Sequence, residues 1–491
     1  MLTALILIPL VGAIAVVVLG RDARAPRVIA TGAAVAELAV AAVVFAGYEG
    51  AGGYAVDVSW IGALDIAYLL RVDGLSAPLV LLNGILGLAA VLVSWNVELR
   101  AREYFAWLAV LQAAVMGVFV AQDLVLFFVF WELELVPMFL LISRWGTGRR
   151  EYSAMKFLVY TLAGSAFMLA AILALYFSFP GSERTFDMAA LAGRDMGSLL
   201  VPGSLVFSGF LVAFAVKLPV FPLHTWLPDA HTDAPTAVSV MLAGVLLKMG
   251  GYGLLRINAG LFPDQLRDAA PLLAALAALN VLYGAFIVLR QTDLKRMVAY
   301  SSVSHMGFVV LGLASTGAAP AALDGVGLSG AALQLFTHGT ITGLLFVMVG
   351  LVYERTHTRH IPDMGGLARQ VPLLALGFMI AGLASLGLPT TSGFVAELLV
   401  FMGTFSVYGL ATALCAFGVV LAAGYILWAA QRVLFGPRLE RWDHLPDARP
   451  VDLAAMAVLI VPIFVVGVYP RLITDAFEAG LAPILRGLGA A

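Results

Sequence analysis

The stretch LVFSGFLVAFAVKLPVFP, Leu205 to Pro222, places a lysine inside an apolar segment and follows it with two prolines. An unpaired lysine at the centre of a bilayer costs about 2.5 to 3.5 kcal/mol even on a lenient insertion scale, so intramembrane lysines usually line pathways or pair with acids. Proline cannot continue a helical hydrogen-bond ladder, and the helix should therefore break beside Lys217. This combination predicts a transporter.

The composition predicts an all-α polytopic membrane protein. Of 491 residues, 62% are hydrophobic and only 12% are charged, whereas soluble domains carry roughly 25% charged residues. The single Cys415 excludes an internal disulfide and a cysteine-ligated zinc ion or iron-sulfur cluster within the chain. The net charge is -2 and the basic residues form no contiguous stripe, which excludes a nucleic-acid partner.

Hydropathy predicts about 14 transmembrane spans. The apolar N-terminus has no positive residue before its run and reads as a retained span, not as a cleavable signal peptide. Of the 28 Lys and Arg residues, 18 fall in loops on the side of Arg21, 7 fall on the other side, and three lie within spans. The positive-inside rule then places Arg21 in the cytoplasm and both termini outside. The spans begin near residues 1, 28, 74, 104, 124, 154, 204, 235, 270, 296, 326, 371, 408 and 450.

Two spans contain a break, the seventh at Lys217 and the twelfth at Gly387, Pro389 and Gly393. Discontinuous helices in corresponding positions point to transporter sites. If spans four to eight and nine to thirteen form two five-helix units, each break falls in the fourth helix, and the second unit is inverted because five is odd. Two coincidental proline kinks are the alternative. The predicted segments are 1–103, 104–258 (first repeat), 259–437 (second repeat) and 438–491, and the outward segments 48–71 and 180–202 read as covering loops or hairpins.

Two carboxylates lie in the fifth span, VLFFVFWELELVPMFLL. Residues two apart on a helix point to nearly opposite faces, so at most one of Glu132 and Glu134 can face Lys217. We favour Glu132. An adjacent carboxylate holds a buried lysine protonated, and losing that contact favours the neutral form. The alternative is a static ion pair that only fixes helix packing.

Further ionisable residues extend this pair into a line. Lys248 lies deep in the eighth span, His305 and His338 lie in the tenth and eleventh, and Glu397 follows the second break. Histidine titrates near neutral pH and can relay protons, although either histidine could instead be a hydrogen-bonded core residue. The sequence thus predicts a polar line from Lys217 to Glu397.

The segment after the first break, HTWLPDAHTDAP, contains His224, Asp229, His231 and Asp233. This spacing superficially resembles a metal site. We expect these side chains to cap the broken helix or to feed protons from the cytoplasm, and we predict no metal or cofactor site.

Four stretches carry a specific resemblance to a known family. They are WELELVP (Trp131 to Pro137), Val216 to Arg256, DLKRMVAYSSVSHMG (Asp293 to Gly307) and LPTTSGFVAELL (Leu388 to Leu399). They resemble the NuoM-type subunit of respiratory complex I, the NADH:quinone oxidoreductase, and the similarity runs over nearly the whole chain. The resemblance implies a proton-translocating, antiporter-like subunit. Residue matching implies that Glu132 and Lys217 are the input pair and that Lys248 is the central lysine. It likewise implies that His305 and His338 are the connecting histidines and that Glu397 is the terminal carboxylate.

The resemblance also implies the chain's surroundings. The chain would hold no redox centre, while NADH, FMN, iron-sulfur clusters and quinone would bind partner subunits. Further antiporter-like subunits, lipids and protons would be its other partners, in the bacterial inner membrane. WELEL also resembles the ferredoxin-dependent photosynthetic relative, which leaves the electron donor open. A subunit of a multi-subunit sodium/proton antiporter and a structural membrane scaffold are the remaining alternatives, and Glu397 and the SVSHMG segment speak against the antiporter.

Overall fold

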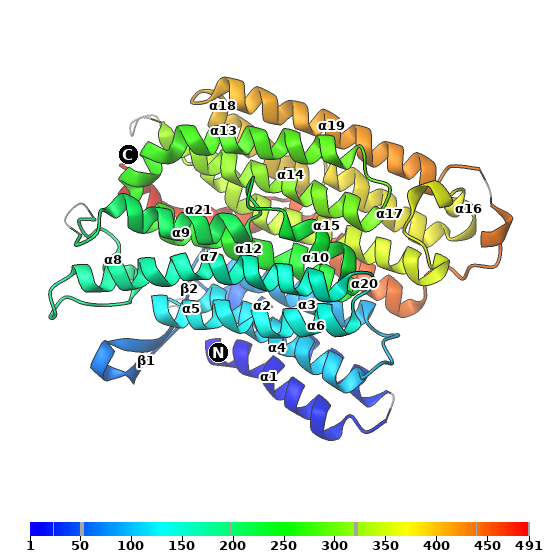
Figure 1. Cartoon of the computed structure of the whole chain (residues 1–491), viewed down its shortest axis with the longest axis horizontal. Coiled ribbons are helices and arrows are strands. Elements are labelled where there is room, and N and C mark those ends of the chain that lie inside the picture. Colours follow the sequence, from blue (N-terminus) through cyan, green and yellow to red (C-terminus); the bar gives the residue numbers. More distant parts are fainter. Residues whose placement is uncertain (23, 50–53, 197–198, 319–322, 438, 490–491) are drawn as a thin grey trace.

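The computed structural model describes residues 1–22, 24–49, 54–196, 199–318, 323–437 and 439–489, and its helices lie side by side along the long axis (Figure 1). Among these residues, 11 helices are long and apolar enough to cross a membrane, and four shorter apolar helices accompany them. Two of the shorter helices are the halves of the interrupted twelfth span. The 14 predicted spans are therefore all present in the described chain, and the all-α polytopic class is confirmed.

The first part of the chain supplies the helices up to the first break. They are α1 (Leu2–Leu19), α2 (Ala25–Gly47), α3 (Ala77–Val93), α4 (Ala101–Val120), α5 (Leu124–Leu133), α6 (Leu135–Trp145), α7 (Arg150–Ser178) and α9 (Gly203–Lys217). The rest are α10 (Trp226–Asp233), α11 (Thr236–Met241), α12 (Leu247–Gly253), α13 (Pro263–Val288), α14 (Leu294–Ala314), α15 (Val326–Thr356), α16 (Leu367–Gln370), α17 (Pro372–Ser385), α18 (Ser392–Phe405), α19 (Gly409–Val433), α20 (Pro450–Val468) and α21 (Arg471–Gly487).

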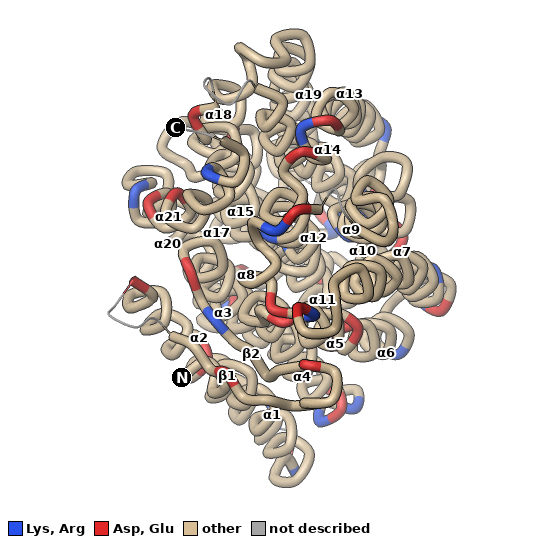
Figure 2. The backbone as a smooth tube through the Cα atoms, turned by 90° about the vertical axis from the view of Figure 1, so that its left-hand side faces the viewer, with Lys and Arg blue, Asp and Glu red and all other residues tan. Residues whose placement is uncertain are grey.

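One end of the bundle carries a β-hairpin, in which β1 (Tyr54–Ile61) pairs antiparallel with β2 (Ile66–Val72). The hairpin, the short helix α8 (Met188–Leu191) and both chain ends lie toward the left in Figure 1. Figure 2 looks onto this end, where most residues are uncharged and the charged residues are few and scattered. The expected hairpin in the first outward segment is confirmed, although residues 50–53 and 197–198 of the two segments lie outside the described residues.

The seventh span breaks where its prolines predict. α9 ends at Lys217, and α10 begins only at Trp226. Backbone groups freed inside a membrane need partners, and Asn280 on α13 supplies them: its Oδ1 accepts from the Phe221 amide at 2.7 Å, and its Nδ2 donates to the Pro219 carbonyl at 3.5 Å. Asn280 therefore holds the broken segment against the second half of the molecule.

The twelfth span breaks between α17 and α18. Gly387 lies at the break with a φ of 76°, the left-handed region that favours glycine. A Cβ there would also come within 2.8 Å of Oε2 of Glu397. Glycine thus permits the turn and leaves room for the carboxylate. Both predicted breaks are confirmed, whereas the boundaries of the two five-helix units stay a prediction.

The eighth span is irregular in a way that the sequence did not predict. Two π-helical turns, Leu242–Leu246 and Leu254–Ala259, flank α12. Such turns disturb the regular backbone ladder and are frequent at functional sites. Here the Nζ of Lys248 donates to the Ala243 carbonyl in the first π turn. The irregular backbone therefore supplies a partner for a buried ammonium group.

The end of α9 packs closely against α12 at Gly250. A Cβ on Gly250 would lie 2.8 Å from both the Leu218 amide nitrogen and the Phe214 carbonyl oxygen. Because those atoms are backbone, they cannot move aside as a flexible side chain could. The position of the first break thus depends on a glycine in the neighbouring span.

We predict that Gly250→Ala lowers the stability of the protein by about 1 to 3 kcal/mol, the usual cost of overpacking. The control is Gly424→Ala in α19, where a Cβ would meet nothing within 4 Å. Alanine in an open helical position should be neutral or stabilising by up to about 1 kcal/mol. Thermal unfolding in detergent measures both, and equal midpoints for the two variants would contradict the close packing.

Candidate functional site

Lys217 forms a buried ion pair with Glu134. The ammonium group of Lys217, 1% exposed, contacts the carboxylate of Glu134, 0% exposed. The Nζ atom also lies 5.5 Å from the ring centroid of Trp131 and 5.3 Å from that of Phe157. Aromatic faces attract cations, and here they also exclude solvent from the pair. The lysine charge is therefore held by one carboxylate in an aromatic enclosure.

The prediction that Glu132 faces Lys217 is wrong, because Glu134 occupies that position. Glu132 is partly exposed, between buried Trp131 and exposed Leu133, and its side chain interacts with Ser165 and with the charge of Lys217. Its Oε1 has no hydrogen-bond partner among the described residues. Glu134 makes the direct contact with Lys217, whereas we favoured Glu132, and the charge of Lys217 acts on both carboxylates.

The sequence did carry a signal for the right choice. Phe127, Trp131 and Met138 are all buried, and Glu134 follows Phe127 by seven residues and Trp131 by three. Residues three, four and seven apart share a helix face. Glu132 instead lies three residues from Val129, which is exposed. The large aromatic residues mark the inner face, and Glu134 is the carboxylate on it.

Lys248 and His338 form the second contact of the line. Nζ of Lys248 lies 2.7 Å from Nδ1 of His338, and both side chains are buried. The other ring nitrogen of His338, Nε2, has no partner among the described residues. An ammonium and an unprotonated imidazole nitrogen at this distance can share one proton. The predicted central lysine and a predicted histidine therefore lie in direct contact.

His305 and Glu397 form the third contact. Nδ1 of His305 lies 3.4 Å from Oε1 of Glu397, and Nε2 of the same ring lies 3.3 Å from Oγ of Ser385. The ring centroids of His305 and His338 are 5.7 Å apart. A small cavity with room for about one water molecule lies between these groups. Glu397, His305, His338 and Lys248 thus form a continuous buried series.

The series and the input pair meet only through packing among the described residues, since no hydrogen bond joins Lys217 to Lys248. Lys217 is in α9 and Lys248 is in α12, and these two helices touch at Gly250, two residues after Lys248. A Cβ on Gly250 would lie 3.1 Å from the Cβ of Lys217. Passage of a proton between them would require water or a movement of this contact. The line therefore has a step at its centre.

In the segment after the first break, the aspartates bond to neighbouring helices and His231 packs in the interior. Asp229 pairs with Lys156 at 2.7 Å, and Asp233 accepts from Ser153 Oγ at 2.6 Å. Within the described ranges, no group of three or more His, Cys, Asp or Glu residues is arranged to hold a metal ion. His231 is buried and stacks on Phe346, with ring centroids 4.5 Å apart. The aspartates tie the break to neighbouring helices, whereas the expected capping is not seen at the start of α10, which has no side-chain cap.

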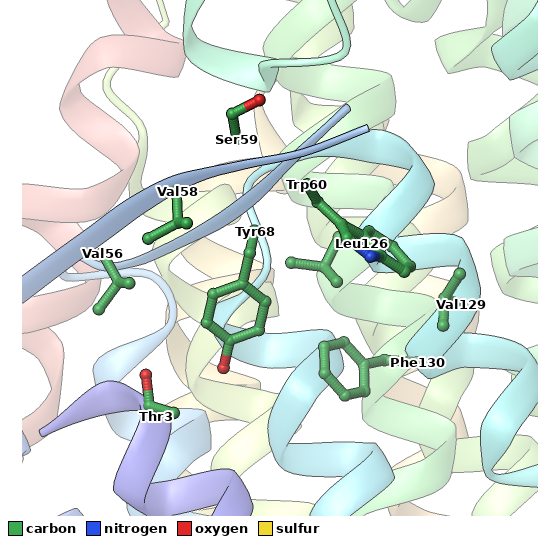
Figure 3. Close-up of a pocket in the computed structure, with 9 residues that line it drawn as sticks. All are labelled: Thr3, Val56, Val58, Ser59, Trp60, Tyr68, Leu126, Val129 and Phe130. Atoms are coloured by element: carbon green, nitrogen blue, oxygen red, sulfur yellow. The ribbon is translucent and has the colours of Figure 1, made fainter. Parts of the chain in front are cut away.

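A larger cavity, of about 500 Å³, lies away from this line, between the β-hairpin, α1 and α5 (Figure 3). Its walls contain no acidic or basic side chain, so it offers no group for proton transfer. It is lined by Thr3, Val56, Val58, Ser59, Trp60, Tyr68, Leu126, Val129 and Phe130. The candidate site is therefore the buried line and not this larger cavity.

The family model described as NADH:quinone oxidoreductase/Mrp antiporter, transmembrane, matches residues 121–422. The chain belongs to this family. It is 42% identical to the NAD(P)H-quinone oxidoreductase chain 4 1 of Nostoc sp., over 97% of this chain and 90% of that protein. The matched range contains both glutamates of the fifth span and every other residue of the line.

Solved structures agree with the family assignment. A chain of respiratory complex I from Thermus thermophilus with bound NADH has a TM-score of 0.89 and 30% identity, with 100% of both chains covered. A chain of the Mrp complex from Dietzia sp. has a TM-score of 0.84 at 21% identity, covering 100% of this chain and 99% of that one. The second likeness shows only that the two chains share a fold.

For this family member we predict that Glu134→Gln is more damaging than Glu132→Gln. Removing Glu134 leaves Lys217 buried without an anion, and breaking a buried pair in this way costs about 3 to 5 kcal/mol. Thermal unfolding and proton pumping of the assembled complex measure the two variants side by side. Equal losses would contradict the observed pairing.

A double variant separates folding from function. Glu134→Gln with Lys217→Met removes both charges, and replacing a buried ion pair by well-packed neutral groups is often neutral for stability. We expect the thermal midpoint to recover while proton pumping stays low.

Proposed function

We propose that this chain is a proton-translocating membrane subunit of an NADH:quinone oxidoreductase-type complex. The observation that carries the proposal is a line of three buried pairs of ionisable side chains, Glu134–Lys217 at one end, Lys248–His338 in the middle and His305–Glu397 at the other end. Ionisable groups inside a membrane are costly and mark ion pathways, and six of them here pair in three contacts between groups that can accept or release a proton. The family membership supports the same role.

In the input pair, the distance between Glu134 and Lys217 determines whether the lysine keeps its proton. While Glu134 contacts Lys217, the carboxylate favours the charged lysine, and if the contact opens, the low-dielectric surroundings favour the neutral form. A change of about two pKa units is worth roughly 2.7 kcal/mol. Moving one charge against 100 mV needs roughly 2.3 kcal/mol. A two-unit change at this pair is therefore enough to drive one proton.

The central and terminal contacts carry the proton onward. Lys248 and His338 hold one proton between Nζ and Nδ1, and His338 faces His305 across the small cavity. The His305–Glu397 contact is an ion pair only when the imidazole is protonated. Arrival of a proton at His305 would thus strengthen that contact, and loss of the proton to Glu397 would weaken it.

The redox chemistry belongs to partner subunits in this proposal. The chain's single cysteine cannot hold a cluster, and we assign NADH, FMN, iron-sulfur clusters and quinone to other subunits. Further antiporter-like subunits are the proposed neighbours, in a bacterial inner membrane with both termini outside. The name of the relatives, NAD(P)H-quinone oxidoreductase chain 4, favours a nicotinamide donor, and the resemblance of WELEL to the photosynthetic relative keeps ferredoxin as the alternative.

A sodium/proton antiporter subunit remains the second candidate, because the Mrp chain shares the fold. The higher identity to the quinone oxidoreductase chain, 42% against 21%, favours the first. Proton pumping that needs quinone reduction and is independent of sodium would decide between them.

We predict that Lys248→Met abolishes most proton pumping in the assembled complex while leaving electron transfer to quinone measurable. Methionine fills a similar volume but removes the proton-carrying nitrogen from His338. The control is Lys156→Met, a lysine that pairs with Asp229 at 2.7 Å away from the line. Proton uptake and quinone reduction measured in the same vesicles give the ratio, and equal ratios in the two variants would exclude Lys248 from the pathway.

A further inference from the structure

Glu37 is a buried carboxyl group outside the line described above. It is the thirteenth of the 23 residues of α2, so it lies about 18 Å along the helix from its first residue. Its side chain is 0% exposed, and neither Oε1 nor Oε2 has a hydrogen-bond partner among the described residues. A carboxyl group is thus enclosed near the middle of a membrane-spanning helix.

Within the described residues, the helices that pack most extensively against α2 carry no cation at the level of Glu37. These helices are α1, α3 and α4. Neither α1 nor α3 contains an acidic, basic, tyrosine, histidine or cysteine residue. The ionisable residues of α4, Arg102, Glu103 and Tyr104, lie in its first turn, at the Arg21 end of the bundle. A charged Glu37 would therefore stay unpaired in the membrane interior.

Two buried amides, Asn83 and Gln112, join α3 to α4. Nδ2 of Asn83 donates to the Gln112 carbonyl at 3.1 Å, while Oδ1 of Asn83 has no partner within the described residues. α2 and α3 pack closely beside these residues. A Cβ on Gly84, the residue after Asn83, would lie 3.1 Å from the Cα of Leu38, the residue after Glu37. The two carboxyl oxygens of Glu37 and the Oδ1 of Asn83 thus each lack a donor among the described residues.

We propose that Glu37 is a proton-binding site separate from the Lys217–Glu397 line, and that it carries its proton at neutral pH. An isolated buried carboxylate is far more costly than the neutral acid, and Glu37 is fully buried with no partner for a negative charge among the described residues. The residue lies outside the range 121–422 that the family model matches. The inference is independent of the proposed function.

Infrared difference spectroscopy of the purified complex tests the protonation directly. Glu37→Gln at neutral pH should remove one carboxylic-acid carbonyl band that shifts in heavy water and should leave the carboxylate bands unchanged. The matched control is Glu478→Gln in α21, an exposed residue that should remove carboxylate bands instead. Loss of a carboxylate band from Glu37→Gln would overturn the proposal, and a shift of that band between sodium and potassium buffers would identify a sodium ion as the ligand.

The pH dependence of stability gives a second test. The unfolded chain releases the proton that the folded chain keeps, so the unfolding midpoint of the wild type should fall relative to that of Glu37→Gln between about pH 6 and pH 9. Glu478→Gln should keep a constant difference from the wild type over this range. A difference for Glu37→Gln that does not change with pH would mean that Glu37 is already ionised in the folded protein, and the proposal would fail.

Discussion

The cost of a buried lysine charge determines the arrangement around the first break. Lys217 is the last residue of α9, where the unpaired carbonyls of a helix C-terminus favour a cation. That end lies in the membrane because Pro219 stops the helix there, and Asn280 compensates the freed backbone groups. Glu134 neutralises the remaining charge. The break puts the end of α9 in the membrane, Asn280 binds the freed backbone groups, and Glu134 neutralises the ammonium group that lies there.

The second break repeats the design with different chemistry. Gly387 leaves room for the carboxylate of Glu397. The partner of Glu397 is His305 and not a lysine. A lysine-carboxylate pair is charged at rest, whereas a histidine-carboxylate pair depends on one proton near neutral pH. The two ends of the line therefore respond to different events, the first to separation of a pair and the second to arrival of a proton. Gly250, where the helices of Lys217 and Lys248 touch, lies between them.

The sequence was sufficient for features that follow from composition and single costly residues. The spans, both breaks, Lys217, Lys248, the two histidines and Glu397 could be predicted because a charge or a proline in an apolar run has few interpretations. Glu134 was missed because the two-residue spacing excludes a shared face without saying which face is inner, and the aromatic pattern of Phe127 and Trp131 was not used. The π turns beside Lys248 and the position of Asn280 depend on packing between distant helices, which periodicity does not reveal. Glu37 was missed because an isolated glutamate in a span has no motif.

The central claim is that the charge on Lys217 drives proton movement and does more than hold helices together. The most direct measurement is the ratio of protons pumped to quinone reduced by the assembled complex carrying Lys217→Ala, with Lys156→Ala as the control for loss of a paired lysine. The account predicts a lower ratio for Lys217→Ala and an unchanged ratio for the control. A full ratio in Lys217→Ala would show that the buried pair is structural and would contradict the mechanism.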